Sequence, residues 1–187
     1  MGTFLKYAGL IFGVTLVFWS FLFFGRQQNV YEICLITGLI VSLLFFIIIL
    51  LGKHSLKAKI AMVAFVVLCV FLEQISEPKL IDASYKRFIK QNNSALTEIN
   101  NLLLNKPGDI LILNNEIKDQ SSLLTPSEKQ KVLDNRQKLR VYMISRTNDE
   151  IYYGLWGFLD VRLGLTYWTS NSEPNKSYRH LIGRWYH

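Results

Sequence analysis

The residue types that build disulfides, metal sites and acid–base pairs are scarce in this chain. Its 187 residues include two cysteines, Cys34 and Cys69, and three histidines. Both cysteines lie in hydrophobic stretches, so the polar remainder of the chain has no thiol for a disulfide or a zinc site. The composition therefore excludes a disulfide framework there, and we expect no metal.

Short catalytic motifs are missing as well. The sequence contains no HExxH, GxSxG, P-loop or GxGxxG pattern. It therefore predicts no catalytic residue and no cofactor, and we expect a protein that is not an enzyme.

Charge is nearly absent from the first 75 residues, which hold five Lys or Arg and two acidic residues. Residues 76–187 hold sixteen Lys or Arg and twelve acidic residues. This division predicts a transmembrane region over 1–75 and a soluble domain over 76–187. The net charge of +7 would suit nucleic acid. Basic flanks beside membrane helices are a simpler explanation, so we expect membrane lipid and no nucleic acid as a partner.

Three hydrophobic segments predict helices over about 5–24, 31–51 and 56–75. Tyr7–Phe24 and Ile33–Leu51 carry no charge, and each is long enough to cross a hydrocarbon core of roughly 30 Å. The third uncharged run, Ile60–Leu72, is shorter, and its length also fits a re-entrant or buried helix. We expect it to span, with Lys57 and Lys59 reaching to the interface.

The distribution of lysine predicts the orientation. Loop 52–59 carries three lysines, whereas the opposite loop carries only Arg26. Cytoplasmic loops are enriched in basic residues, so the N-terminus and loop 52–59 are expected in the cytoplasm of a plasma (bacterial inner) membrane. Three spans then place the soluble domain outside, and two spans would leave it in the cytoplasm.

Two features indicate close helix packing. Gly9 and Gly13 lie one turn apart and leave a flat patch, which suits either a neighbouring helix of this chain or a partner. After a break expected at Ser76–Pro78, an amphipathic helix is predicted to about Asn105. We expect its apolar side to pack on the core of its own domain. Asn92 falls within the apolar series, where a buried Asn can alternatively set the register of self-association. The apolar positions are Ile81, Tyr85, Phe88, Ala95, Ile99 and Leu102.

The rest of the chain predicts a small α+β domain. Ile110–Leu113 is a strand candidate, and Thr125-Pro-Ser-Glu128 is a capping box that begins a helix over about Pro126–Lys138. A C-terminal antiparallel β-meander is expected after it. Its strands are predicted over 140–145, 151–158, 161–169 and 178–186.

Aromatic and basic residues of this meander form the candidate ligand or partner surface. The residues are Arg162, Trp168, Arg179, His180 and Arg184. Guanidinium groups suit phosphate or carboxylate, and the rings suit a core, a binding face or a membrane interface. The sequence favours a membrane-anchored, non-catalytic binding or accessory protein, such as a subunit of a membrane complex or an immunity-type protein. The alternative is a membrane-bound enzyme or ligand sensor that uses this sheet.

Overall fold

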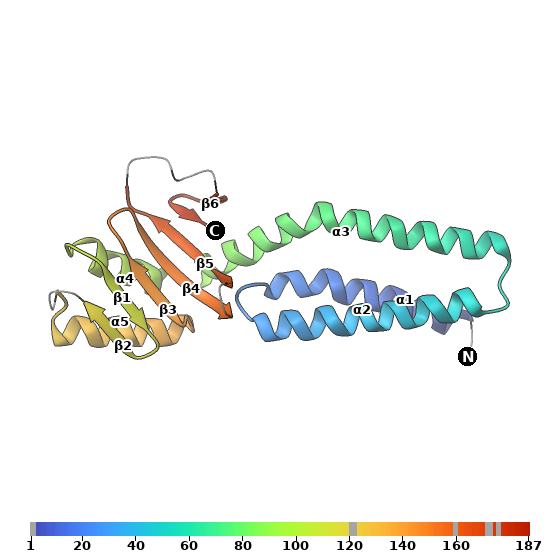
Figure 1. The fold of residues 1–187 in the computed structure, drawn as a ribbon, viewed down its shortest axis with the longest axis horizontal. Coiled ribbons are helices and arrows are strands. Elements are labelled where there is room, and N and C mark those ends of the chain that lie inside the picture. The colour runs from blue at the N-terminus through green and yellow to red at the C-terminus, as the bar shows by residue number, and fades with distance from the viewer. Residues whose placement is uncertain (1–2, 120–122, 159–160, 171–173, 175–176) are drawn as a thin grey trace. The chain divides into compact units, whose positions relative to one another are not determined.

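The computed structural model describes the whole chain apart from residues 1–2, 120–122, 159–160, 171–173 and 175–176. The described residues form five α-helices, a short 3-10 helix and seven β-strands (Figure 1). They divide into two compact units, Met1–Ser84 and Tyr85–His187. The division falls inside a helix, beyond the change in composition at residue 75.

The first unit is built from long apolar helices. They are α1 (Thr3–Ser20), α2 (Gln28–Leu51) and α3 (Leu56–Gln91), with the 3-10 helix η1 (Phe21–Phe23) after α1. All three α-helices are long and apolar enough to cross a membrane, which confirms the three apolar helices predicted near the N-terminus. Figure 1 shows α1 and α2 lying side by side and antiparallel. The chain reverses after η1 at Gly25, whose φ of 68° favours glycine.

Small residues bring α1 and α2 into close contact. A β-carbon at Gly13 would lie 2.7 Å from the Ser42 amide nitrogen and 2.9 Å from the Gly38 carbonyl oxygen. A β-carbon at Gly9 would instead meet the ring of Phe45. The structure therefore places both glycines of the GxxxG pattern against α2 of the same chain.

The break predicted at Ser76–Pro78 is wrong, because α3 continues through Pro78 to Gln91. Proline removes one amide donor and crowds the preceding turn, so it kinks a helix that is stabilised on both sides rather than ending it. Figure 1 shows α3 bowed along its length.

The continuous helix predicted to about Asn105 is also wrong, because it is interrupted at Asn92. The Asn92 side-chain amide donates a 2.9 Å hydrogen bond to the Phe88 carbonyl oxygen, and α4 (Asn93–Leu104) begins afresh. Asn92 thus bonds to the preceding turn of its own backbone. The buried apolar residues of α4 are Leu96, Ile99 and Leu103, so Leu96 and Leu103 take the places predicted for Ala95 and Leu102.

The second unit contains one antiparallel sheet in the order β2-β1-β3-β4-β5-β7-β6. Its strands are β1 (Ile110–Leu113), β2 (Glu116–Asp119), β3 (Met143–Arg146), β4 (Glu150–Phe158), β5 (Val161–Trp168), β6 (His180–Ile182) and β7 (Trp185–Tyr186). The sheet predicted at the C-terminal end is confirmed. The single closing strand predicted over 178–186 is wrong, because Gly183, with φ of 57°, turns the chain into a hairpin.

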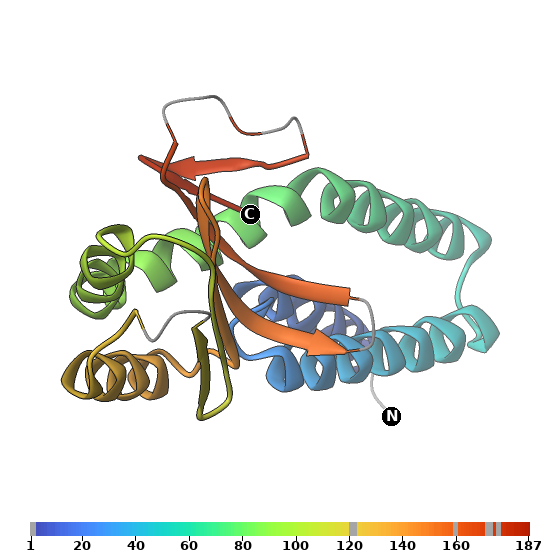
Figure 2. The same ribbon diagram turned by 60° about the vertical axis from the view of Figure 1, so that its left-hand side comes forward.

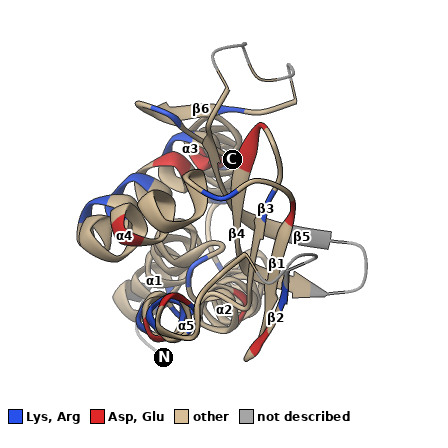
Figure 3. Cartoon of the chain, turned by 90° about the vertical axis from the view of Figure 1, so that its left-hand side faces the viewer, with Lys and Arg blue, Asp and Glu red and all other residues tan. Residues whose placement is uncertain are grey.

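Two helices, α4 and α5 (Pro126–Leu139), cover one face of this sheet (Figures 2 and 3). Strand residues on that face alternate with outward ones, and Ile112, Ile144 and Leu165 are completely buried. The capping box predicted at Thr125 and Glu128 is present at the start of α5. The buried Asn135 side-chain amide of α5 donates a 2.9 Å hydrogen bond to the Glu98 carboxylate of α4, which joins the two helices.

Candidate partner-binding face

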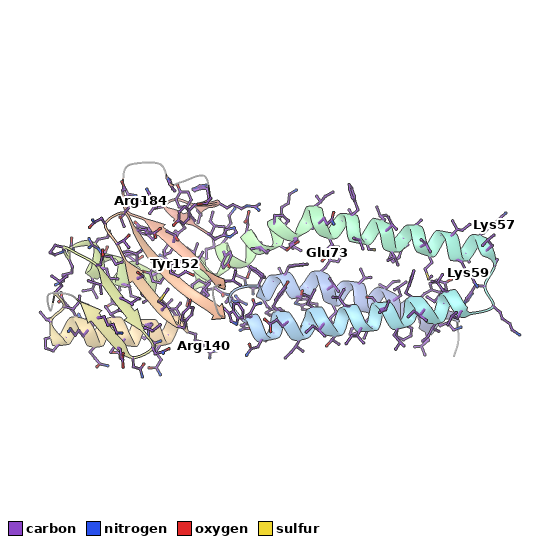
Figure 4. All side chains as sticks on the ribbon, viewed as in Figure 1. Lys57, Lys59, Glu73, Arg140, Tyr152 and Arg184 are labelled. Atoms are coloured by element: carbon purple, nitrogen blue, oxygen red, sulfur yellow. The ribbon has the colours of Figure 1, made fainter. Side chains whose placement is uncertain are left out.

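The sheet face turned away from α4 and α5 is concave, and we call it the open face. The strand register places Leu111, Ser145, Tyr152 and Thr166 next to one another across β1, β3, β4 and β5. The concavity has a volume of about 720 Å³. Its lining residues are Leu111, Leu113, Tyr142, Met143, Ser145, Glu150, Tyr152 and Gly157. Figure 4 labels Tyr152 on this sheet.

Glycines let two tyrosine rings lie on the strands of the open face. A β-carbon at Gly154 would lie 2.7 Å from the Tyr142 ring, and one at Gly157 would lie 2.7 Å from the Tyr142 hydroxyl. A β-carbon at Gly164 would meet the Tyr152 ring at the same distance. Glycine inside a strand often marks such a close approach. These glycines therefore allow the two rings to form part of the wall of the concavity.

A carboxylate lies at one end of the open face. The Tyr178 hydroxyl donates a 2.9 Å hydrogen bond to Glu150, and the Tyr178 ring contacts Trp168 with centroids 5.9 Å apart. Burial raises the pKa of Tyr178, and the hydrogen bond to the Glu150 carboxylate and its charge raise it further. Tyr178 is therefore a neutral donor at physiological pH, and it holds Glu150 in place.

The structure does not gather the basic residues of the predicted surface into one site. Arg179 exchanges two backbone hydrogen bonds with His187, at 2.8 and 3.0 Å, at one end of the β6–β7 hairpin. Arg184 follows the turn at the other end, where its Nη1 donates to the Thr169 carbonyl oxygen at 3.2 Å. Arginines at opposite ends of a hairpin do not form a single donor fork for an anion.

The other predicted residues have different surroundings. Trp168 belongs to the end of the open face near Glu150. His180 packs on the Tyr186 ring with centroids 5.1 Å apart, and its Nε2 lies 3.0 Å from the Gly183 carbonyl oxygen. Arg162 lies on β5 opposite Gly157, and its side chain is outside the described residues.

Sequence reasoning missed Tyr142, Tyr152 and Glu150 as members of a common face. The available signal was the set of glycines at 154, 157 and 164, within two strands rich in aromatic residues. Which tyrosine ring lies against each glycine is set by the pairing of β3 with β4 and of β4 with β5.

Few reactive side chains are among the described residues that line the open face. Among the described lining residues, Ser145 is the hydroxyl nucleophile candidate, and no histidine lies beside it to serve as its base. Within the described part of the chain, no group of three His, Cys, Asp or Glu side chains is placed to hold a metal. The other lining groups are tyrosine rings, aliphatic side chains and one carboxylate.

Comparison with known protein families, with curated proteins and with solved structures finds no match to this chain.

Proposed function

We propose that the chain is a multi-pass protein of the cell (inner) membrane whose second unit binds a protein partner through the open face. In this proposal it is a non-catalytic binding or accessory protein, such as a subunit of a membrane complex or an immunity-type protein. The single observation that carries the proposal is the concave, tyrosine-lined face that the helices of its own unit leave uncovered.

Membrane insertion is supported by the surfaces of α1, α2 and α3. Large apolar side chains project from all three, and Ile33 on α2 and Val67 on α3 are 65% and 62% exposed. Exposed apolar surface on this scale is unfavourable in water and favourable in a bilayer. The lysines of loop 52–59 favour a cytoplasmic position for that loop, which puts the second unit outside.

Recognition of a polypeptide is supported by the chemistry of the open face. Tyrosine offers a large rigid contact area together with a hydroxyl, and it is enriched at the energetic centres of protein interfaces. Tyr142 and Tyr152 supply two such rings beside Leu111, Leu113 and Met143. A partner would cover apolar atoms at the centre and meet Glu150 toward the edge.

The binding test places an obstacle in the concavity of the full-length protein. Ser145→Arg adds a long charged side chain to the middle of the open face, whereas Ser94→Arg adds the same group to the exposed surface of α4. A photo-reactive residue at Leu111 should give a discrete cross-linked product in intact cells. S145R should abolish that product and S94R should preserve it. Equal cross-linking in both variants, or no product at Leu111, would contradict a partner on this face.

The orientation is tested separately with paired reporters fused after His187, one active only in the cytoplasm and one only outside. Activity of the external reporter is expected. Activity of the cytoplasmic reporter would show that α3 does not cross the membrane.

A second candidate function is ligand sensing by the same face. The volume of about 720 Å³ lies in the range of small-molecule sites, roughly 300–1,000 Å³. A sensor would bind its ligand as the purified protein, with a change in Trp168 fluorescence that S145R removes. Saturable binding without any cross-linked protein would favour this function.

A further inference from the structure

The bow in α3 leaves a groove inside the first unit, between α3 and the α1–α2 hairpin. The two sides meet at one end in a buried cluster of Leu10, Ile49 and Met62. They meet again at the other end, where the Ser84 hydroxyl donates a 2.9 Å hydrogen bond to the Leu22 carbonyl oxygen. Between these contacts the groove has a volume of about 250 Å³.

The groove is lined almost wholly by hydrocarbon. Its apolar lining includes Val14, Phe18, Leu39, Phe46, Val66 and Val70. Apolar cavities exclude water, because water in them finds no hydrogen-bond partners. A hydrocarbon occupant is therefore favoured over solvent.

The size of the groove excludes a helix as its occupant. From Met62 to Glu73, α3 rises about 16 Å, and a helix is about 10 Å across with its side chains. A helical segment of that length would fill on the order of 1,200 Å³, which exceeds the roughly 730 Å³ of empty space in the groove. A single hydrocarbon chain is thin enough to enter from the side.

Charge distinguishes the two ends of the groove. Glu73 lines one end, and Glu77 follows it one turn later on the same helix. Lys57 and Lys59 lie at the beginning of α3, toward the other end (Figure 4). A carboxylate at the mouth attracts a protonated amine and repels an anionic headgroup.

We propose that this groove binds one acyl chain of a phospholipid whose headgroup carries an amine, of the phosphatidylethanolamine class, with the headgroup at Glu73. The inference rests on the membrane insertion proposed above, because the lipid must reach the groove from the bilayer. It assigns α3 a resident lipid in addition to the lipids that surround the protein.

A matched pair of substitutions on α3 tests the site. Val70 lines the groove, whereas Val67 is 62% exposed and is not among the lining residues. Val70→Trp should fill the groove, and Val67→Trp should add the same ring to the lipid-facing surface. Val14→Trp fills the groove from α1 and guards against a folding defect specific to V70W.

The measurement is phospholipid content after purification of the full chain from membranes in mild detergent. About one tightly held phosphatidylethanolamine per chain is expected for the natural sequence and for V67W. V70W and V14W should lose it several-fold while keeping their helix content by circular dichroism. Equal retention in V70W and V67W, or no retained lipid in the natural sequence, would overturn the proposal.

The headgroup preference is tested with Glu73→Gln after exchange into vesicles that mix phosphatidylethanolamine and phosphatidylglycerol. The natural chain should retain the amine-bearing lipid, and E73Q should retain both kinds equally. An unchanged preference in E73Q would remove the role of Glu73. Failure of membrane insertion is recognised separately, since the chain would then be released from membranes by alkaline carbonate.

Discussion

The Tyr153 hydroxyl of β4 donates a 2.6 Å hydrogen bond to the Asn100 side-chain oxygen of α4, and both residues are buried. This bond joins the covered face of the sheet to a helix across the core of the second unit. Its two polar groups lie among apolar side chains, so each depends on the other for a partner.

Tyr153→Phe should lower the free energy of unfolding of the second unit by about 1–3 kcal/mol, because it leaves a buried acceptor on Asn100 unpaired. Denaturant unfolding followed by tryptophan fluorescence measures it, since Trp185 packs on Tyr153 with centroids 5.6 Å apart. The matched control is Tyr178→Phe, which removes a hydrogen bond that is only partly buried. A loss in Y153F no larger than in Y178F would contradict this prediction.

The same tyrosine should make the second unit sensitive to alkali. Burial, with a smaller effect of Tyr167, raises the pKa of Tyr153 well above its ordinary value of 10. The unfolded chain therefore loses this proton first, so stability is full below about pH 10 and falls as the pH rises above it. Unfolding midpoints measured between pH 8 and 11 should fall less steeply in Y153F than in the natural chain.

Acid should weaken the start of α5. A hydrogen bond from Lys106 and others from Thr125, together with the Lys106 charge, lower the pKa of Glu128 to about 2 from its ordinary 4.5. Its contribution to stability is present above pH 4.5 and is lost as the pH falls toward 2. Glu128→Gln should flatten this part of the stability profile, measured by thermal unfolding. A profile identical to that of the natural chain would show that the Lys106 contact does not persist in solution.

The two glycines of α1 should differ in their tolerance of a methyl group. At Gly13 the new β-carbon meets backbone atoms of Ser42 and Gly38, which cannot move independently. At Gly9 it meets the end of the Phe45 side chain, which can turn. Gly13→Ala should therefore destabilise the α1–α2 pair by about 1–3 kcal/mol and Gly9→Ala by less. Thermal unfolding in detergent gives the comparison, and the reverse order would contradict the observed packing.

Pro78→Ala should straighten α3 and narrow the groove beside it. Alanine restores the amide donor that proline lacks and removes the crowding of the preceding turn. Spin labels at Leu44 on α2 and Val67 on α3, both exposed, report the separation of these helices. The distance between the labels should change in P78A while helix content stays the same or increases. An unchanged distance would mean that packing at the two ends of the groove, rather than proline, bends the helix.

Secondary-structure elements that are determined by residues close in sequence could be predicted from the sequence. The run Ile110–Leu113 forms β1 with the predicted bounds, and the capping box at Thr125 and Glu128 starts α5 where expected. The break predicted at Pro78 is wrong because the stability of the long helix on both sides outweighs the loss of one hydrogen bond. Strand β2 was missed because Glu116, Lys118 and Asp119 dominate its four residues, and it forms by pairing with β1.

The candidate site was less accessible to sequence reasoning than the fold. Trp168 was selected from its strand, and it does lie next to Tyr178 and Glu150. Tyr142 precedes β3 by one residue and reaches the open face by crossing β4, which no spacing along the chain predicts. Arg179, His180 and Arg184 of the predicted surface lie at the β6–β7 hairpin. The concavity lies over β1, β3 and β4, which are farther along the sheet.

The two outermost strands of the sheet have a consequence for self-assembly. Strand β2 has four residues and carries Glu116 and Lys118, and β6 has only three. Edge strands this short are poor templates for a further strand, and β2 is also charged, so the sheet resists growing into fibrils or joining a second sheet edge to edge. Under the membrane insertion proposed above, this protection matters because three apolar helices must also be kept from aggregating before they reach a bilayer. Under the proposed function, a polypeptide partner would be selected by side-chain fit to the face of the sheet, with little contribution from backbone pairing at its margins.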